Sequence, residues 1–418
     1  MSDLWTTSLS RRAFGRLAAG AAAMATALAP PARRALAGSQ QQPAAPVDQV
    51  RIRRSGVGLR AYDPSAAFDG FTLFKPLGPA SRTVYLVDMQ GTVVHTWDMP
   101  YPGAYGFLTE RGTLFYNGTI PNPAYPGRVL QAGVALEADW DGNILWEVRN
   151  PDHHHDGIRL RNGNVLLDCY DVLPADLAAR VQGGVSGTER PWGMDGDYLQ
   201  EVTTDGQVVW EWRVWEHLDP VEDAIPWPMD SRAVWTQCNG IAEWPNGDIT
   251  MSFRNISKVV TLSRPTGEIL WKLGLPLISG QHTPSALANG NLLIFDNGPH
   301  RLPDPEHDPE SSASASFPHS RVLEVAVPSG EIAWRYQEAR VSDFFSPRIS
   351  SAQRLPNGNT LIDEGWFGRF FEVTADGDLV WEYVNPYFDR LAGAEVNQVF
   401  RAYRYGAQEI DRARATAS

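Results

Sequence analysis

The chain has 418 residues, of which 43% are hydrophobic and 20% charged, and its formal net charge is −13. This length and apolar content suffice for a large buried core, and the 37 Gly and 31 Pro favour a fold with many turns. The first 37 residues hold five Arg and one Asp, so the rest of the chain carries −17. So acidic a body has no electrostatic reason to bind nucleic acid or an anionic membrane surface, and we expect neither as a partner.

Residues 1–37 are predicted to be a twin-arginine signal peptide. Ser10–Phe14 reads SRRAF, a stretch of small apolar residues follows, and Ala35–Ala37 has the small-x-small pattern of a cleavage site. We therefore expect the twin-arginine translocation machinery as a partner and a periplasmic or secreted protein. No other stretch is long and apolar enough to span a bilayer, so stable membrane insertion is not expected. Residues 38–54 are predicted to be a flexible linker.

One strand pattern then recurs along the chain at spacings of roughly 45–65 residues. A polar turn with a Gly leads into a β-branched strand that carries a Trp, and such turns and residues favour hairpins. The copies place their Trp residues at Trp146, Trp210, Trp271, Trp334 and Trp381, with a looser copy at Trp97. We interpret these Trp residues as packing between repeats rather than as a substrate platform.

A second pattern alternates with the first, in which an Asn-Gly or Arg-Gly turn leads into an apolar strand. Its turn glycines are Gly112, Gly163, Gly247, Gly290 and Gly358. Two hairpins per repeat make a four-stranded sheet, and repeated sheets of this kind are typical of propeller blades. The sequence predicts an all-β, six-bladed β-propeller over residues 55–407, with a flexible C-terminal tail at 408–418. The segment 399–405 is expected to complete the first blade, so that strands from both termini close the ring and remove its edges.

Candidate site residues come from one register position in the repeat. In a propeller the inner strand of each blade begins at the axis, so residues at equal offsets from the same turn should converge there. The residues eight positions before the turn glycines are Ala104, His155, Asn239, His282 and Ser350. Because most of them are polar and two are imidazoles, they predict a site at the axis.

Further candidates lie beside these positions. Arg301 and Arg321 are candidate anion clamps, because a guanidinium offers a planar fork of donors to an anion. His154, in the run Asp152–Asp156, neighbours His155. The two cysteines, Cys169 and Cys238, lack zinc-pair spacing, and an exported protein could hold them either as a disulfide or as two buried thiols.

Together these segments resemble the bacterial aryl-sulfate sulfotransferase family. The resemblance spans about residues 55–407 and rests on GFTLFKP, VYLVD, GTVVHTW, HHHDGIRLRNGNVLL, VWTQCNGI, MSFRNISKVV, GQHTPSALANGNLLIFDNG, SRVLEV and VFRAYRY. It implies a six-bladed propeller in the periplasm that moves a sulfuryl group from an aryl sulfate to a phenol, without a nucleotide donor or other cofactor. The implied route passes through a sulfated histidine, with further histidines and an arginine holding the sulfate.

The resemblance assigns roles to particular residues. His155 or its neighbour His154, His282, and Arg301 with Arg321 as the competing assignment take the catalytic positions, and a small aromatic or sulfated molecule is the implied substrate. The chain departs from the family at one point, because the aligned nucleophilic histidine falls near 344–350 and no histidine follows His319. The remaining substrate-binding candidates are His154, Gln237, Asn239, Arg321, Arg348 and Ser350.

Two other functions stay open at the level of sequence. One is a metal-dependent lyase or hydrolase that acts on an exported polysaccharide or phenolic polymer, with His154, His155, His282 and Asp296 as ligands. The other is a propeller that binds a ligand at its axis without chemical change. No bound metal is expected if the sulfotransferase assignment holds.

Overall fold

The structure is a computed structural model that describes residue 47 and residues 56–303, 317–391 and 393–418. The described residues from 56 onward belong to one compact unit. The predicted signal peptide and most of the predicted linker lie outside the described residues. Among the helices that are described, none has the length and apolarity to cross a membrane.

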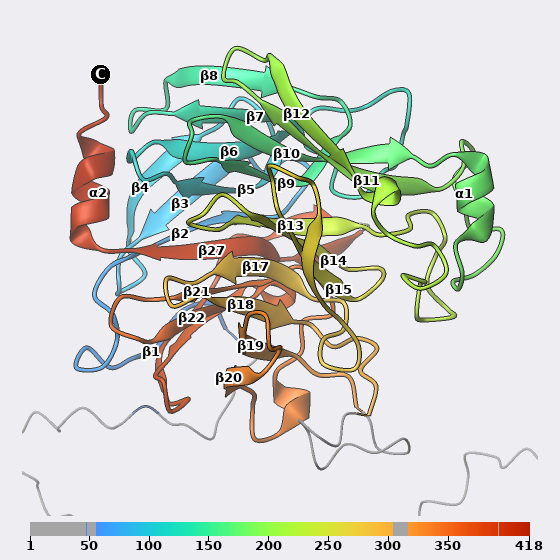
Figure 1. Cartoon of the computed structure of the whole chain (residues 1–418). Coiled ribbons are helices and arrows are strands. Elements are labelled where there is room, and N and C mark those ends of the chain that lie inside the picture. The colour runs from blue at the N-terminus through green and yellow to red at the C-terminus, as the bar shows by residue number, and fades with distance from the viewer. Residues whose placement is uncertain (1–46, 48–55, 304–316, 392) are drawn as a thin grey trace, which may run out of the picture. The chain divides into compact units, whose positions relative to one another are not determined.

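Six antiparallel sheets form the blades of a propeller, as predicted from the repeats (Figure 1). Listed from the axis outward, the first three blades are β27 (Val399–Tyr405), β2 (Phe71–Pro76), β3 (Thr83–Val87) and β4 (Val93–Asp98); β5 (Gly103–Leu108), β6 (Leu114–Thr119), β7 (Gly133–Ala138) and β8 (Ile144–Arg149); and β9 (His153–Arg159), β10 (Val165–Val172), β11 (Asp195–Val202) and β12 (Val208–Arg213).

The other three blades follow in chain order. They are β13 (Cys238–Glu243), β14 (Ile249–Phe253), β15 (Lys258–Leu262) and β16 (Ile269–Leu273); β17 (His282–Ala286), β18 (Asn291–Asp296), β19 (Arg321–Ala326) and β20 (Ile332–Tyr336); and β21 (Ser351–Arg354), β22 (Thr360–Glu364), β23 (Arg369–Val373), β24 (Leu379–Val384) and β1 (Gly58–Tyr62). Outside the blades lie the hairpin β25 (Asp389–Leu391) and β26 (Ala394–Val396), helices α1 (Ala175–Arg180) and α2 (Ala407–Arg414), and the 3-10 turns η1 (Val214–Glu216), η2 (Val341–Asp343) and η3 (Gly365–Phe367).

The two turn types fold as hairpins for the reason that the sequence suggests. Gly142 joins β7 to β8 with φ of 86°, and Gly163 joins β9 to β10 with φ of 88°, a conformation that glycine adopts without steric cost. Apolar, β-branched residues then fill the strands that follow. The repeated hairpins therefore set both the strand order and the position of each inner strand.

Strands from both ends of the described chain close the ring. β27 pairs with β2, so that Tyr405 lies opposite Phe71 and Ala402 opposite Phe74 (Figure 1). β1 pairs with β24 on the outside of the last blade. The predicted closure of the first blade by residues 399–405 is confirmed, and it brings the C-terminal strand to the axis.

The C-terminal residues differ from the flexible tail predicted for 408–418. Residues 407–414 form α2, in which Ile410 and Ala413 are fully buried against Leu108 and Leu114. The apolar pair at i and i+3 lies on one face of the helix, which is enough to attach a short helix to the rim. The two cysteines are both free and buried.

The repeated Trp residues lie on the outermost of the four repeated strands and contact the next blade. The indole N–H of Trp97 donates to Asp139 O at 3.1 Å, that of Trp334 to Ala375 O at 2.7 Å, and that of Trp381 to Met89 O at 2.9 Å. Each acceptor belongs to a turn of the neighbouring blade. This geometry supports the packing role that the sequence suggested.

We expect Trp381→Ala to lower the free energy of unfolding by about 3–5 kcal/mol, because the side chain is fully buried between the last blade and the first. Trp381→Phe keeps most of the volume and loses the indole N–H, so it should cost clearly less. Urea unfolding followed by circular dichroism measures both variants. A Trp381→Ala protein as stable as the wild type would show that this contact does not hold the ring closed.

Candidate functional site

Four of the five register positions counted from the sequence lie on inner strands, Ser350 directly precedes β21, and all five are buried. The strand pairing shifts beside Ala104, Asn239 and His282 and across the His154–Asp156 segment, which marks a β-bulge in four of the inner strands. A bulge turns a side chain out of the regular alternation of a strand, and bulges are frequent beside functional sites. Backbone φ is positive at His155 (41°) and Ser350 (91°), so the chain holds these residues in strained conformations.

His155 and His282 both lie beside Phe400 on the inner strand β27. Their rings lie 6.3 Å and 6.4 Å from the ring of Phe400, which projects from β27. Burial lowers the pKa of both imidazoles well below the usual value, and the charges of Arg254 and Arg401 lower them further. Both rings are therefore neutral at pH 7.

The ring nitrogens of the two histidines differ in what they contact. His282 Nε2 accepts the backbone N–H of Ile349 at 3.1 Å, so its hydrogen is on Nδ1, which donates to Asn297 Oδ1 at 2.8 Å. His155 Nδ1 lies 2.6 Å from His154 Nδ1, whereas His155 Nε2 has no hydrogen-bond partner among the described residues. Of the four nitrogens, His155 Nε2 is the one left for a substrate.

Two arginines beside these histidines have no carboxylate partner within the described part of the chain. Arg254 contacts Gln237 Oε1 at 3.5 Å, and Arg348 stacks on the ring of Trp366 at 4.5 Å. Burial lowers the pKa of Arg254, the nearby charge of Asp230 raises it in part, and the charge of Arg348 lowers it further. Gln237 and Arg254 are partly exposed and Arg348 is exposed, so solvent reaches part of each of these groups. Unpaired guanidinium groups in an acidic protein are suited to bind an anion.

The two arginines that the sequence singled out as clamps have another partner. Arg301 Nη1 lies 2.9 Å and Arg321 Nη2 3.0 Å from the same oxygen of Asp296. Burial raises the pKa of Asp296, but the two guanidinium groups lower it by more. With its carboxylate held by two arginines, Asp296 is not free to join His154, His155 and His282 as a metal ligand, and the four-residue metal cluster considered from the sequence does not form.

A buried ion pair links the C-terminal strand to the site. Arg401 on β27 donates to both oxygens of Asp156, at 3.1 Å and 2.8 Å, and stacks on the ring of Tyr105 at 4.4 Å. The same carboxylate accepts the hydroxyl of Tyr105 on β5 and, at 2.7 Å, the backbone N–H of Ile241 on β13. Asp156 directly follows His155, so this network fixes the strand segment from which His155 projects.

The other candidates serve mainly to connect strands. Asn239 donates to Gln281 O at 2.8 Å, and Ser350 Oγ donates to Ser346 Oγ at 2.8 Å while it accepts the N–H of Gly365 at 3.0 Å. His154 faces away from the axis, toward two carboxyl groups of its own blade. Sequence reasoning missed Arg254, Arg401 and Phe400, although all three lie in segments that carried the family resemblance.

Comparison with known proteins gives one family and one curated relative. Residues 133–386 match the family model described as Arylsulfotransferase (ASST). The chain is 24% identical to the arylsulfate sulfotransferase AssT of Escherichia coli O6:H1, over 69% of this chain and 58% of that protein. It therefore spans less than two thirds of the length of this relative.

Similar solved structures add only weak likenesses. A protein of unknown function from Bacteroides caccae is 14% identical and gives a TM-score of 0.48, with 80% of this chain and 98% of the other covered. A catalytically inactive virginiamycin B lyase from Staphylococcus aureus is 14% identical and gives a TM-score of 0.37, with 72% and 83% covered. TM-scores this low support no argument about chemistry.

We expect Asp156→Asn to lower the free energy of unfolding by about 3–5 kcal/mol, because it leaves the Arg401 guanidinium buried without its counter-charge. Adding Arg401→Met to this variant should recover part of the loss. Urea unfolding measures the cycle, with Glu147→Gln, at a partly exposed surface pair with Arg149, as a control that should cost less than about 1 kcal/mol. An Asp156→Asn protein of wild-type stability would mean that the bonds of this carboxylate to the inner strands do not stabilise the fold.

Proposed function

The chain belongs to the arylsulfotransferase (ASST) family, and we propose that it transfers a sulfuryl group from an aryl sulfate to a phenolic acceptor at the propeller axis. The observation that carries the proposal is that His155, a neutral imidazole whose Nε2 forms no hydrogen bond among the described residues, lies near Arg254, which like Arg348 forms no ion pair with a carboxylate there. A sulfate ester needs both a nucleophile and positive charge on its oxygens.

The proposed reaction has two steps through a sulfated His155. The lone pair of His155 Nε2 attacks sulfur, a nitrogen–sulfur bond forms, and the bond from sulfur to the aryl oxygen breaks with its electron pair on the leaving phenolate. The acceptor phenol then attacks sulfur, and the nitrogen–sulfur bond returns its electron pair to Nε2. The proton that the acceptor loses balances the one that the leaving phenolate takes up.

Arg254 and Arg348 are proposed to hold the sulfuryl oxygens, a role that the sequence had given to Arg301 and Arg321. Their guanidinium groups are the local positive charge in an acidic chain, and charge-assisted hydrogen bonds to them would strengthen as negative charge collects on the oxygens. Gln237, which contacts Arg254, is proposed to orient it toward the substrate.

His282 is proposed to position the site rather than to attack sulfur. Both of its ring nitrogens are already bonded within the protein, and one of them holds Ile349, the residue that follows Arg348. The imidazole therefore fixes the segment that carries this arginine. His155 would then take the nucleophilic role for which the family resemblance expects a histidine near Ser350.

The same proposal includes export. The twin-arginine pattern at Ser10–Phe14 supports transport to the periplasm or beyond, and the substrates would be phenols and aryl sulfates that occur there.

A colorimetric assay with 4-nitrophenyl sulfate as donor and phenol as acceptor tests the proposal. We expect turnover by the wild type, a fall in kcat/KM of at least about a thousand-fold for His155→Ala, and a rise in KM of about ten- to hundred-fold for Arg254→Gln. His282→Asn should lower kcat/KM less than His155→Ala does. His217→Asn, which alters a ring stacked on Trp212 on the outer strand of its blade, is the matched control and should leave turnover unchanged.

Two outcomes would contradict the proposal. A folded wild-type protein that turns over no aryl sulfate would remove the activity. Full activity in His155→Ala, with loss in His282→Asn, would transfer the nucleophilic role to His282.

A further inference from the structure

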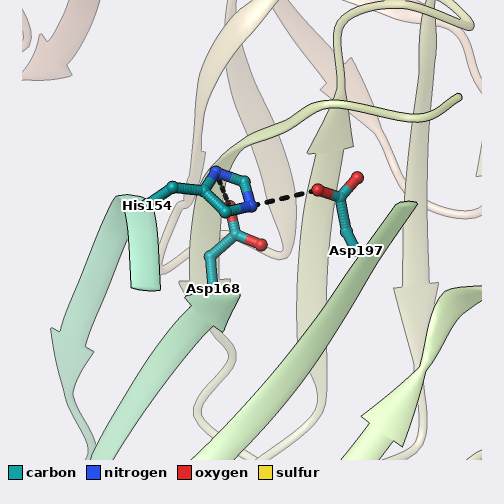
Figure 2. Close-up of side chains that lie close together, drawn as sticks. All are labelled: His154, Asp168 and Asp197. Carbon is teal, nitrogen blue, oxygen red and sulfur yellow. Dashed lines mark ion pairs between the residues drawn. The ribbon is translucent and has the colours of Figure 1, made fainter. Parts of the chain in front are cut away.

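Three side chains from adjacent strands of the third blade form a closed cluster behind His155. His154 on β9, Asp168 on β10 and Asp197 on β11 are fully buried, and one potential ligand atom of each lies within 4.8 Å of the others. Figure 2 shows the imidazole between the two carboxyl groups, with all three side chains pointing toward one another. The substrate chemistry proposed above uses none of these groups directly.

The polar atoms of this cluster lack the partners that buried polar atoms normally have. Neither oxygen of Asp168 forms a hydrogen bond among the described residues, and the same holds for Asp197 Oδ1 and His154 Nε2. Their contacts are with one another: His154 Nδ1 lies 3.5 Å from Asp168 Oδ2, and His154 Nε2 lies 3.1 Å from Asp197 Oδ1. The polar group beside Asp168 is the Cys238 thiol, a weak donor. Buried carboxylates are usually satisfied by several donors, so four such atoms facing one space need an explanation.

Among the described residues, no arginine or lysine forms an ion pair with either carboxyl group of the cluster. Arg128 lies nearby, but its guanidinium is bonded to Asp195 at 2.7 Å and Asp152 at 2.6 Å, and Arg401 is bonded to Asp156. Burial raises the pKa of Asp168 well above its usual value and that of Asp197 to about 7. Without a cation, burial therefore favours the protonated, uncharged form of both groups, whereas a dication would offset the charges of the two carboxylates.

The distances and the surrounding bonds suit metal ligation. His154 Nε2 lies 3.1 Å from Asp197 Oδ1, which falls between the roughly 3.0 Å and 3.4 Å that separate two ligands with bonds of about 2.1 Å at a right angle and at a tetrahedral angle. The other oxygen of Asp197 accepts the Thr236 hydroxyl and, at 2.9 Å, the Cys238 N–H, so Oδ1 is aimed inward. His154 Nδ1 is occupied by His155 at 2.6 Å, which leaves Nε2 for a metal.

We propose that His154, Asp168 and Asp197 form a buried binding site for a divalent first-row transition-metal ion, with Nε2 and carboxylate oxygens as ligands. An imidazole nitrogen among the ligands favours Zn²⁺ or Mn²⁺ over Ca²⁺ and Mg²⁺, which prefer oxygen alone. The site is separate from Asp296 and from the axis pocket.

A bound ion would also set the hydrogen of His155, an effect that rests on the proposed function. With its Nε2 on the metal, His154 carries its hydrogen on Nδ1 and donates it to His155 Nδ1, so His155 carries its own hydrogen on Nε2. That tautomer cannot attack sulfur. The metal-bound form should therefore transfer sulfate more slowly than the metal-free form.

Metal content and binding of the full-length protein test the site without reference to activity. The wild type is dialysed against a chelator and titrated with Zn²⁺ and with Mn²⁺ by calorimetry, and metal content is read by mass spectrometry. We expect one ion per chain and a higher melting temperature with metal. Asp168→Asn and Asp197→Asn should weaken binding more than about 100-fold. Asp171→Asn, on the same strand but bonded to Arg213 at 2.6 Å, should bind as the wild type does.

A wild-type protein that takes up neither ion and whose melting temperature does not respond would overturn the site, whatever its activity. Equal binding by the wild type, Asp168→Asn and Asp197→Asn would place the ion elsewhere and also overturn it. If both Asn variants fail to fold, the wild-type stoichiometry decides, together with the retention of metal by Asp171→Asn. Metal binding without any change in transfer rate would remove only the effect on His155.

Discussion

The carboxylate of Asp156 is the constraint on which the axis of this propeller depends. It projects from β9 and receives hydrogen bonds from groups on β27, β5 and β13, so it joins the inner strands of four blades. Its main partner, Arg401, comes from β27, the strand that closes the ring. The strand that closes the fold therefore also fixes the position of His155. The position of His155 therefore does not depend on a loop. The bulge that carries it is held by the bonds of Asp156 to the neighbouring inner strands.

Charge is distributed around this centre in two different ways. Arg301, Arg321 and Arg401 are bonded to buried carboxylates, and they stabilise the fold. Arg254 and Arg348 have no such partner among the described residues, so their charge remains available at the axis. In a chain with a net charge of −13, this local difference supports the proposal of an anionic substrate at the axis.

The fold could be predicted from the sequence because each blade repeats the same turns. The Asn-Gly and Asp-Gly turns specify hairpins locally, and counting back from them places His155 and His282 on inner strands at the axis. The partners of the arginines could not be predicted in this way. Nothing in the sequence distinguishes Arg301, which the fold places against Asp296, from Arg254, which it does not. Arg401 and Phe400 were missed because they lie on β27, which has no turn glycine from which to count.

The run of three histidines shows a second limit of the sequence. Regular alternation would place His153 and His155 on one face, but the bulge separates them: His153 bonds to Asn117 and Asp168 O, His154 faces two carboxyl groups, and His155 faces the axis. No pattern in the sequence reports a bulge of this kind. The carboxyl groups that meet His154 come from β10 and β11, so their approach depends on strand pairing and not on spacing.

The most direct measurement of the account is a crystal structure of the full-length protein soaked with sulfate at neutral pH. The account predicts a sulfate ion between His155 Nε2 and the guanidinium groups of Arg254 and Arg348, with the Asp156–Arg401 pair unchanged behind it. Sulfate bound at Arg301 and Arg321 with the axis pocket empty, or imidazoles of His155 and His282 that do not face one pocket, would contradict it.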